Sequence, residues 1–371
     1  MRLRVATFNV ENLASRHSFG PKERPETAPA LSLFDVPDPE QREAVQRSLA
    51  VALEDDKREL SALALAQAAP DILALQEIDN LGVLQAFFSN YVHRLTDRRY
   101  GHFRLIDGND PRGIDVAFAA RLDLLDQKGA KARSHQEETF GGLGVHTEEL
   151  AALRIGPDDL VFNRDCLEVD LDFGEAELTV YVCHFKAIAD RLDGRDKTRP
   201  IRHAEALGVR RIIERRFGEG WRDANWIIAG DLNDFTEQVR DGEAVPAKPS
   251  GLDPLLDGFA INPVAVLPTS QRWTYFHHQA ERKDRPFEEA HVQLDYVLLS
   301  PALAGANPTP TVELLRHGLP YRVPLDPAHP DRSIGHLATR ADRYPRVGWD
   351  RPKASDHSPL IVTVDLPRKR G

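Results

Sequence analysis

The chain has 371 residues, of which 41% are hydrophobic and 29% are charged, a composition typical of a folded protein with a hydrophobic core. No apolar run approaches the roughly 20 residues that span a bilayer, and the sequence begins a strand at once, with no room for a signal peptide. We therefore expect a cytoplasmic protein with no membrane partner. The net charge of −10 counts against a protein that coats nucleic acid, because such proteins usually carry strongly basic surfaces. It does not exclude a nuclease whose metal site holds the phosphate locally.

The first predicted unit is a strand, a helix and a second strand. β-Branched and aromatic residues predict a strand at residues 4–10, and a polar, proline-rich insert follows at residues 15–37. A helix is expected from Asp38, which is followed by a proline in the first turn and a glutamine three residues later. Pro70 ends this helix, and residues 72–75 form a short apolar strand.

A comparable unit occurs in the middle of the chain. Residues 178–186 alternate as a strand with two faces, residues 200–217 show a helical apolar pattern, and residues 226–229 form a buried strand. Polar residues cluster where the strands of both units end, as ligand-binding residues do in layered α/β proteins. The two units predict a single large α/β domain in which two β-sheets pack face to face with helices outside.

The last third contains two further predicted strands and a long connection. The strands lie at residues 292–299 and 360–364. Between them, residues 307–352 are rich in proline, arginine and histidine, and this segment is too long for an ordinary loop. We expect it to be an insert that borders the functional site, because it leads directly into Asp356 and His357.

Five residues are expected to have structural rather than chemical roles. Cys166 and Cys183 fall opposite each other across a predicted two-residue turn, and reduced thiols are favoured in a cytosolic chain. Trp273 and Trp349 are expected to pack in the core rather than stack on a base. Arg202, on the second predicted helix, is expected to face solvent.

Four polar clusters flank strongly apolar strands. They are Phe8-Asn9-Val-Glu11-Asn, Leu75-Gln-Glu77-Ile, Gly230-Asp231-Leu-Asn233-Asp and Ser355-Asp356-His357-Ser-Pro. Each has a structural alternative, such as a turn residue, but a buried carboxylate without a partner is costly. A site with many oxygen ligands, no thiolate and few imidazoles suits Mg²⁺ or Mn²⁺ rather than zinc.

These motifs, in this order, resemble those of the endonuclease/exonuclease/phosphatase family, which includes deoxyribonucleases, AP endonucleases and neutral sphingomyelinases. The resemblance runs from Asn9 to His357 and is strongest to bacterial nuclease-type members. It implies a four-layered α/β sandwich of two mixed β-sheets packed face to face with helices outside, formed by residues 1–371 as a single domain. It also implies a phosphoric ester hydrolase that uses Mg²⁺ or Mn²⁺.

The resemblance assigns four residues to the metal side of the site. Glu77 matches the metal-binding glutamate of the family, and Asn9 matches the asparagine beside that metal. Asp356, which precedes the final histidine, is a metal-side carboxylate. Glu11 occupies a position at which only some members place a second carboxylate, so its alternative stays open: a carboxylate that supports the metal ligands without binding the metal, or one at the surface.

The resemblance assigns five further residues to catalysis. Asp231 matches the aspartate that activates or orients the attacking water, and Asn233 the asparagine that holds water or phosphate. Asp295 matches the aspartate paired with the final histidine, His357, and a neighbouring carboxylate keeps such an imidazole protonated. His184 matches a histidine found in secreted nucleases and deoxyribonucleases.

Three residues are candidates for phosphate or substrate contacts. Strand alternation places His184 and Lys186 on one face, where two cationic groups would bind a phosphate. Arg112 lies at a loop-to-strand junction and could bind phosphate as well, while Asp115 could pair with His184. The alternative for Lys186 and Arg112 is a solvated surface charge.

The sequence therefore predicts a divalent-metal-dependent phosphodiesterase, with a nuclease acting on DNA or RNA as the leading hypothesis. A phosphatase or a small-molecule or lipid phosphodiesterase on the same fold is the alternative, although no apolar membrane-facing hairpin is present. A non-catalytic binding module would lack one of the motif residues. No obligate protein partner is evident from the sequence.

Overall fold

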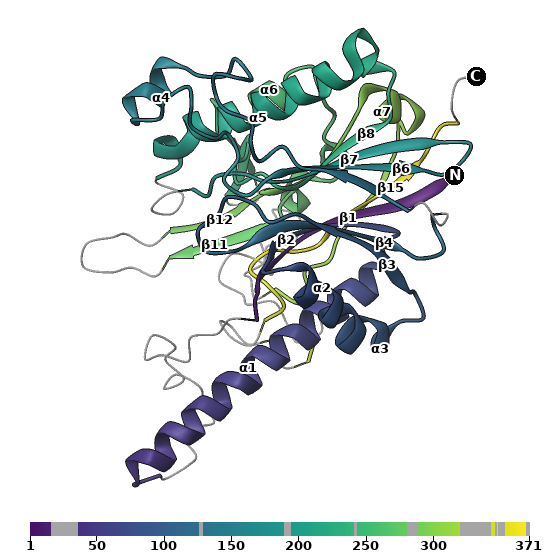
Figure 1. The fold of residues 1–371 in the computed structure, drawn as a ribbon. Coiled ribbons are helices and arrows are strands. Elements are labelled where there is room, and N and C mark those ends of the chain that lie inside the picture. Colours follow the sequence, from purple (N-terminus) through teal and green to yellow (C-terminus); the bar gives the residue numbers. More distant parts are fainter. Residues whose placement is uncertain are drawn as a thin grey trace.

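Two mixed β-sheets lie face to face at the centre of the computed structural model (Figure 1). The structure describes residues 1–15, 36–125, 129–188, 194–240, 243–279, 288–319, 343–345, 347 and 353–368. The six strands of the first sheet, in spatial order, are β14 (Thr311–Leu314), β15 (Leu360–Asp365), β1 (Arg2–Leu13), β2 (Ile72–Ile78), β4 (Asp115–Arg121) and β3 (Tyr100–Leu105). The five strands of the second are β13 (Asp295–Leu299), β8 (Trp226–Asp231), β7 (Glu177–His184), β6 (Cys166–Asp172) and β5 (Lys131–Arg133).

Each sheet contains one parallel pair, and a long helix makes each crossover. β1 and β2 pair in parallel and are joined through α1 (Pro39–Ala68), whereas β7 and β8 pair in parallel and are joined through α5 (Arg195–Phe217). The other neighbours in both sheets are antiparallel. Because the carboxyl ends of all four parallel strands lie at one end of the sandwich, the polar clusters that follow them are brought together there.

An apolar core fills the space between the two sheets. Val5 and Phe118 from the six-stranded sheet pack with Val180, Ile227 and Val297 from the five-stranded sheet, and all five are fully buried. Burial of such side chains contributes roughly 1.5–3 kcal/mol each relative to exposure. This core fixes the spacing of the sheets and therefore the distance between the polar groups at their ends.

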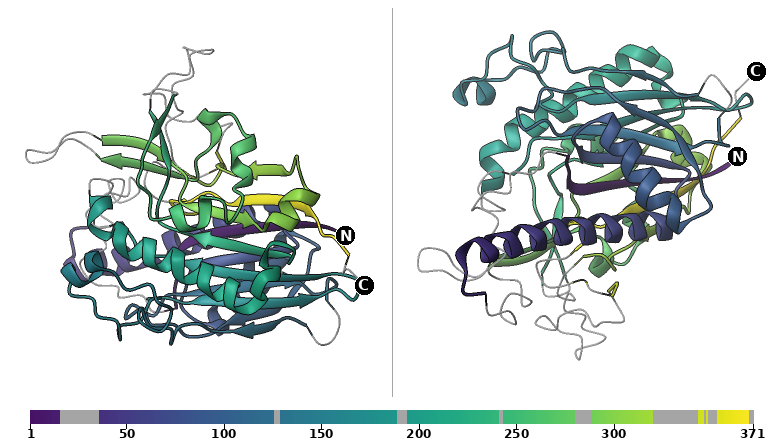
Figure 2. Two further views of the ribbon diagram at one scale, coloured as in Figure 1. Left: turned by 90° about the horizontal axis from the view of Figure 1, so that it is seen from above. Right: turned by 60° about the horizontal axis from the view of Figure 1, so that its bottom comes forward.

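Helices form the two outer layers. α5 and α6 (Asp253–Leu256) cover the outer face of the five-stranded sheet through a second apolar cluster. α1 and α2 (Leu81–Phe87) cover the six-stranded sheet on the opposite side, as the two views of Figure 2 show. The remaining helical elements are short: a π-helical turn at Phe88–Val92, α3 (His93–Leu95), α4 (Glu148–Ala152), α7 (Pro301–Ala306) and 3₁₀ turns at Gly218–Arg222, Pro263–Val266 and Thr269–Gln271.

The first helix begins and ends where the sequence predicts. The side chain of Asp38 caps α1 by accepting a hydrogen bond from the backbone N–H of Gln41 at 2.8 Å, which satisfies one of the free donors of the first turn. The helix ends at Ala68, and Ala69 adopts a left-handed conformation immediately before Pro70.

A small third sheet was not predicted. It contains β10 (Glu243–Pro246), β9 (Glu237–Arg240), β12 (Glu288–Val292) and β11 (Tyr275–Gln279), in that spatial order. The strand predicted at residues 292–299 is wrong as one element, because the chain leaves β12 at Val292 and enters β13 of a different sheet at Asp295. The hairpin of β11 and β12 projects from the sandwich (Figure 1).

The predicted four-layered α/β sandwich is confirmed. Most of the predicted insert at residues 15–37 and most of that at 307–352 lie outside the described residues. Of the second insert, β14 extends the six-stranded sheet. Within the described residues, no helix combines the length and the apolar character that crossing a membrane requires.

The residues expected to be structural are mostly buried. Cys166 and Cys183 face each other across β6 and β7 as free thiols, and Trp273 is buried, whereas Trp349 lies outside the described residues. The expectation for Arg202 is wrong: its side chain is fully buried and paired with Asp234.

Candidate active site

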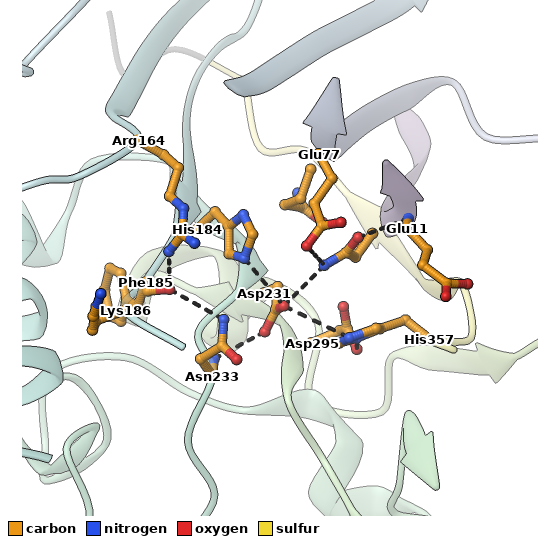
Figure 3. A network of polar contacts seen from close by, with 12 residues as sticks. Glu11, Glu77, Arg164, His184, Phe185, Lys186, Asp231, Asn233, Asp295 and His357 are labelled. Atoms are coloured by element: carbon orange, nitrogen blue, oxygen red, sulfur yellow. Dashed lines mark hydrogen bonds and ion pairs between the residues drawn. The ribbon is translucent and has the colours of Figure 1, made fainter. Parts of the chain in front are cut away.

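A cleft of about 460 Å³ opens at the end of the sandwich where the parallel strands terminate. Nine residues predicted for the site line it: Asn9, Glu11, Glu77, Arg112, His184, Asp231, Asn233, Asp356 and His357. Figure 3 shows the side chains of His184, Asn233 and His357 around Asp231. The two halves of the chain therefore meet at one place, as the strand-end clusters predicted.

Unusual backbone conformations turn three of these side chains into the cleft. Glu11, Glu77 and Asn233 have φ values of 52°, 66° and 50°, which residues other than glycine rarely adopt. The pairing of β1 with β2 and of β2 with β4 also shifts register next to Glu11 and Glu77. Such conformations cost on the order of 1–3 kcal/mol each and concentrate at functional sites.

Asp231, the last residue of β8, lies at the centre of the site. One of its carboxylate oxygens, Oδ2, accepts a hydrogen bond from Asn9 Nδ2 at 3.1 Å and lies 3.5 Å from His184 Nε2 and 3.8 Å from His357 Nε2. The other oxygen accepts the backbone N–H of Asn233 at 2.9 Å. The carboxylate is thus held in one orientation by groups from both sheets.

Burial shifts the pKa values of Asp231 and His184 in opposite directions. Burial raises the pKa of Asp231 to about 7, against the lowering effect of the charge on His357. Burial also drives the pKa of His184 well below its usual value, and the charge on Arg164 adds to this. At neutral pH we therefore expect a neutral His184 beside an aspartate that can exchange a proton.

His357 and Asp295 form a buried pair behind Asp231. His357 Nδ1 lies 2.8 Å from Asp295 Oδ2, and the backbone N–H of Asp295 donates to Thr274 Oγ1 at 3.1 Å. Burial alone would lower the pKa of His357, but the carboxylates of Asp295 and Asp231 outweigh burial and raise the pKa well above its usual value. We therefore expect a protonated imidazole at neutral pH, with Nε2 on the side of Asp231.

The metal-side residues predicted from the sequence differ in their partners. Glu77 Oε1 accepts a hydrogen bond from Asn9 Nδ2 at 3.3 Å. Glu11 instead forms ion pairs with Lys353 at 3.0 Å and Lys57 at 3.9 Å, and the Lys57 ammonium also donates to the Glu11 carbonyl. These two lysines compensate the charge of Glu11, which favours a carboxylate that does not bind the metal over a metal ligand.

A second set of side chains has ligand atoms close enough together to hold a metal ion. Ligand atoms of Asp231, Asp295 and His357 all lie within 4.8 Å of one another. However, a protonated His357 has no free lone pair, and its two N–H groups already face the two carboxylates. The oxygen donors of Asn9, Glu77 and Asp356 also line the cleft, and a ligand set of oxygen atoms alone fits Mg²⁺ or Mn²⁺ better.

Arg164 lines the cleft but was not identified from the sequence. Its side chain is buried. Its Nε atom lies 2.9 Å from Asp110 Oδ2, and its Nη1 atom donates to the backbone carbonyl of Phe185 at 2.9 Å. The more exposed Arg112 pairs with the same Asp110 oxygen at 2.9 Å. A single aspartate therefore aligns two guanidinium groups along one wall of the cleft.

Two predicted substrate contacts are not supported. The proposed pair of Asp115 and His184 is wrong: Asp115 is buried and accepts the backbone N–H of Gly108 at 2.8 Å, while His184 faces Asp231. Burial raises the pKa of Asp115 to about 6. β7 ends at His184, so strand alternation does not extend to Lys186, and Lys186 is not among the residues that line the cleft.

The chain belongs to the endonuclease/exonuclease/phosphatase family, whose model matches residues 4–250. The protein is therefore a phosphoric ester hydrolase. The matched range includes Asn9, Glu77 and Asp231, whereas Asp295 and His357 lie beyond it. No curated protein matches the sequence.

Several solved structures are similar to the chain at low sequence identity. Truncated TDP2 of Caenorhabditis elegans is 15% identical, with 98% of this chain and 97% of that chain covered and a TM-score of 0.47. An endonuclease/exonuclease/phosphatase family protein from Leptotrichia buccalis is 11% identical, with 98% and 99% covered and a TM-score of 0.49. A mannosyl-6-phosphatase of Bacteroides thetaiotaomicron is 13% identical, with 98% and 99% covered and a TM-score of 0.47.

Proposed function

We propose that the protein is a divalent-metal-dependent phosphodiesterase that hydrolyses phosphodiester bonds in DNA or RNA. The observation that carries this proposal is the position of Asp231, a buried carboxylate between a neutral and a protonated imidazole in an open cleft. An anionic phosphodiester repels hydroxide, so its hydrolysis needs positive charge at the phosphoryl oxygens and a positioned water molecule.

Asp231 orients the attacking water and accepts its proton. A pKa of about 7 suits this role, because a general base works best with a pKa near the pH of the reaction. The Asn9 amide donates to Oδ2 of the Asp231 carboxylate, and the backbone N–H of Asn233 donates to Oδ1. These contacts fix the orientation of the carboxylate in the wall of the cleft.

His357 stabilises the negative charge that develops on the phosphoryl group. Asp295 holds Nδ1 at 2.8 Å and keeps the ring protonated, so Nε2–H remains a donor toward the cleft. Asn233 supports the substrate from the opposite side, with its amide fixed by a hydrogen bond to the Phe185 carbonyl at 3.1 Å. Arg112 and Arg164 provide further positive charge along the wall.

Glu77, Asp356 and Asn9 would hold the divalent cation. When bound, Mg²⁺ or Mn²⁺ neutralises charge on the phosphoryl oxygens. The side chain of Asp356 is 39% exposed, so this carboxylate can reach an ion that enters from solvent. Glu77 is anchored by Asn9, which links this part of the site to Asp231.

One observation favours a second candidate, a small-molecule phosphodiesterase or phosphatase. The net charge of −10 disfavours a long polyanion, because nucleic-acid binding gains much of its affinity from neutralised phosphates. A small ester needs only the local positive charge of the cleft. Both candidates use the same residues and differ in the size of the substrate.

A substrate panel tests the proposal. Purified protein with Mg²⁺ or Mn²⁺ should be incubated with plasmid DNA, single-stranded DNA, RNA, bis-p-nitrophenyl phosphate and p-nitrophenyl phosphate, beside an Asp231→Asn variant purified in the same way. We expect metal-dependent cleavage of a nucleic acid and of the diester, both lost in the variant. Cleavage of p-nitrophenyl phosphate alone would favour a phosphatase, and full turnover in excess EDTA would contradict the metal requirement.

A further inference from the structure

One face of α5 carries a buried polar stripe. The stripe consists of Arg195, Thr198, Arg202 and Glu205, spaced three, four and three residues apart so that they lie on one side of the helix. All four side chains are buried, and Arg202 and Glu205 are at most 1% exposed. Charged residues seldom occupy such positions unless they are paired, so the partners of this stripe indicate what it does.

The first partner is the segment that follows β8. Arg195 Nε lies 2.5 Å from Asp234 Oδ1, and Arg202 Nε lies 3.0 Å from Asp234 Oδ2. Arg195 also donates to the Phe235 carbonyl at 2.8 Å. Asp234 directly follows Asn233, so both arginines hold the chain immediately beyond the candidate catalytic residues.

The second partner is the segment that follows β7. Glu205 Oε2 accepts the backbone N–H of Lys186 at 2.8 Å, and Arg202 Nη1 donates to the Lys186 carbonyl at 3.3 Å. Thr198 Oγ1 donates to the Ala187 carbonyl at 3.3 Å and accepts a hydrogen bond from Arg202 at 2.6 Å. The stripe therefore binds the backbone just beyond His184.

The two segments meet at the candidate active site. The Phe185 carbonyl accepts a hydrogen bond from Asn233 Nδ2 at 3.1 Å and another from Arg164 at 2.9 Å (Figure 3). Asn233 also has a left-handed φ of 50°, a conformation that surrounding contacts must maintain. The orientation of its amide thus depends on both segments at once.

Stability alone does not explain the stripe. Taking charged groups out of water is costly, and replacing buried ion pairs with well-packed apolar side chains is often neutral or stabilising. What a planar guanidinium adds is fixed geometry, because it can bind a carboxylate and carbonyls at defined angles. Arg202 uses this property to contact Asp234, the Lys186 carbonyl and the Arg195 carbonyl together.

We infer that the buried polar stripe of α5 positions Asn233 for catalysis by fixing the backbone beyond β7 and β8 relative to each other. Arg202 is its central positioning residue. This inference rests on the proposed function, since it assigns the stripe to the same phosphodiester hydrolysis. It does not involve the metal-side residues, which lie on β1, on β2 and before β15.

The test is Arg202→Lys, which keeps the charge but cannot make the same set of contacts. We expect kcat on bis-p-nitrophenyl phosphate to fall by about 10- to 100-fold, as misplacement of a site residue does, with KM and the metal Kd from calorimetry unchanged. In an Asn233→Ala background the same substitution should change kcat by less than about twofold, because residues acting as one unit are not additive. The matched control is Arg216→Lys, since Arg216 lies on the same helix and pairs instead with Glu168 and Asp170.

Unchanged kcat in Arg202→Lys would overturn the inference, and so would an equal loss in both backgrounds. Hydrogen exchange keeps the test independent of activity: peptides covering residues 184–188 and 231–236 should exchange faster in Arg202→Lys but not in Arg216→Lys. Unchanged exchange there would also overturn it. If the wild type hydrolyses no substrate, the proposed function fails while exchange still decides the role of the stripe. If Arg202→Lys does not fold, Thr198→Val, which removes one hydroxyl of the stripe, is tested instead. Its effect on kcat should likewise disappear in the Asn233→Ala background.

Discussion

The two sheets contribute unlike halves to one cleft. The six-stranded side supplies Glu11 and Asp356, whose side chains are 22% and 39% exposed. The five-stranded side supplies Asp231, His184 and Asp295, whose side chains are at most 2% exposed. One half therefore presents carboxylates to solvent, whereas the other holds its polar groups in a fixed, buried network.

This difference indicates that the site separates metal binding from proton transfer and charge stabilisation. A metal ion that enters from solvent needs accessible oxygen donors, and the carboxylate of Asp356 is one such donor. Groups that move protons and stabilise developing charge work best when they are preorganised and shielded from water. Substitutions in the two halves should consequently change different measurable quantities.

The largest effect is expected on the buried side. Asp231→Ala should lower kcat by about 10²–10⁴-fold, the usual contribution of a general base, and leave the metal Kd and the Tm nearly unchanged because Asp231 lies at a strand end. Kinetics at saturating Mn²⁺, with calorimetry and thermal melts, measure all three. If the variant retains more than about a tenth of wild-type kcat, Asp231 does not activate water and the proposed mechanism is wrong.

A smaller loss is expected at His357, which precedes β15 of the six-stranded sheet but contacts Asp231 and Asp295 of the buried half. His357→Ala should lower kcat by about 10²-fold, and Asp295→Asn should do the same in milder form, because it removes the partner that keeps the ring charged. The Asp231→Ala, His357→Ala double variant should lose less than the product of the single effects. A double variant that shows the full product would mean that the two residues act on separate steps.

The solvent-facing half should respond in metal affinity. Glu77→Gln should raise the metal concentration needed for half-maximal activity by about 10- to 100-fold, a loss typical of changes at metal sites. Glu11→Gln is the matched control and should change it by less than about threefold, because Lys57 and Lys353 already compensate its charge. Equal shifts in both variants, measured by calorimetry with Mn²⁺, would make Glu11 a metal ligand.

The smallest expected effect concerns stability rather than catalysis. Burial raises the pKa of Glu205 to about 7, against the lowering effect of its hydrogen bond from Lys186. A raised carboxyl pKa gives stability that is present below the unfolded pKa of 4.5 and is lost as pH rises toward 7. Relative to Glu205→Gln, the wild type should therefore lose on the order of 1–3 kcal/mol between pH 5 and pH 8. Denaturation curves measured at each pH give the free energy of unfolding of both proteins. A difference between the two free energies that stays constant from pH 5 to pH 8 would contradict the assignment.

The sequence predicted the parts of the site whose chemistry is contained in short motifs. Asn9, Glu77 and Asp231 each follow an apolar strand, and the ends of parallel strands meet, so local pattern sufficed to bring them together. Arg164 has no such pattern, because its partners Asp110 and Phe185 are distant in sequence. Only the packed structure reveals that contact.

The error at Arg202 has a different cause. The predicted helix began at Pro200, whereas α5 begins at Arg195. Starting at Pro200 leaves Arg195 and Thr198 outside the helix and hides the stripe that they form with Arg202. The small third sheet was also missed, because its strands are only four or five residues long and its two hairpins are joined through β9 and β12, which lie far apart in the sequence.

The pairing of β1 with β15 has a consequence for how the site forms. Arg2 lies opposite Asp365, and Ser355 Oγ donates to the Asn9 carbonyl at 2.7 Å, so the cleft is complete only when residues 355–365 have docked beside β1. Contacts between residues this far apart in sequence are slow to form. The cleft that joins the two sheets therefore depends on one of the most non-local strand pairings of the fold.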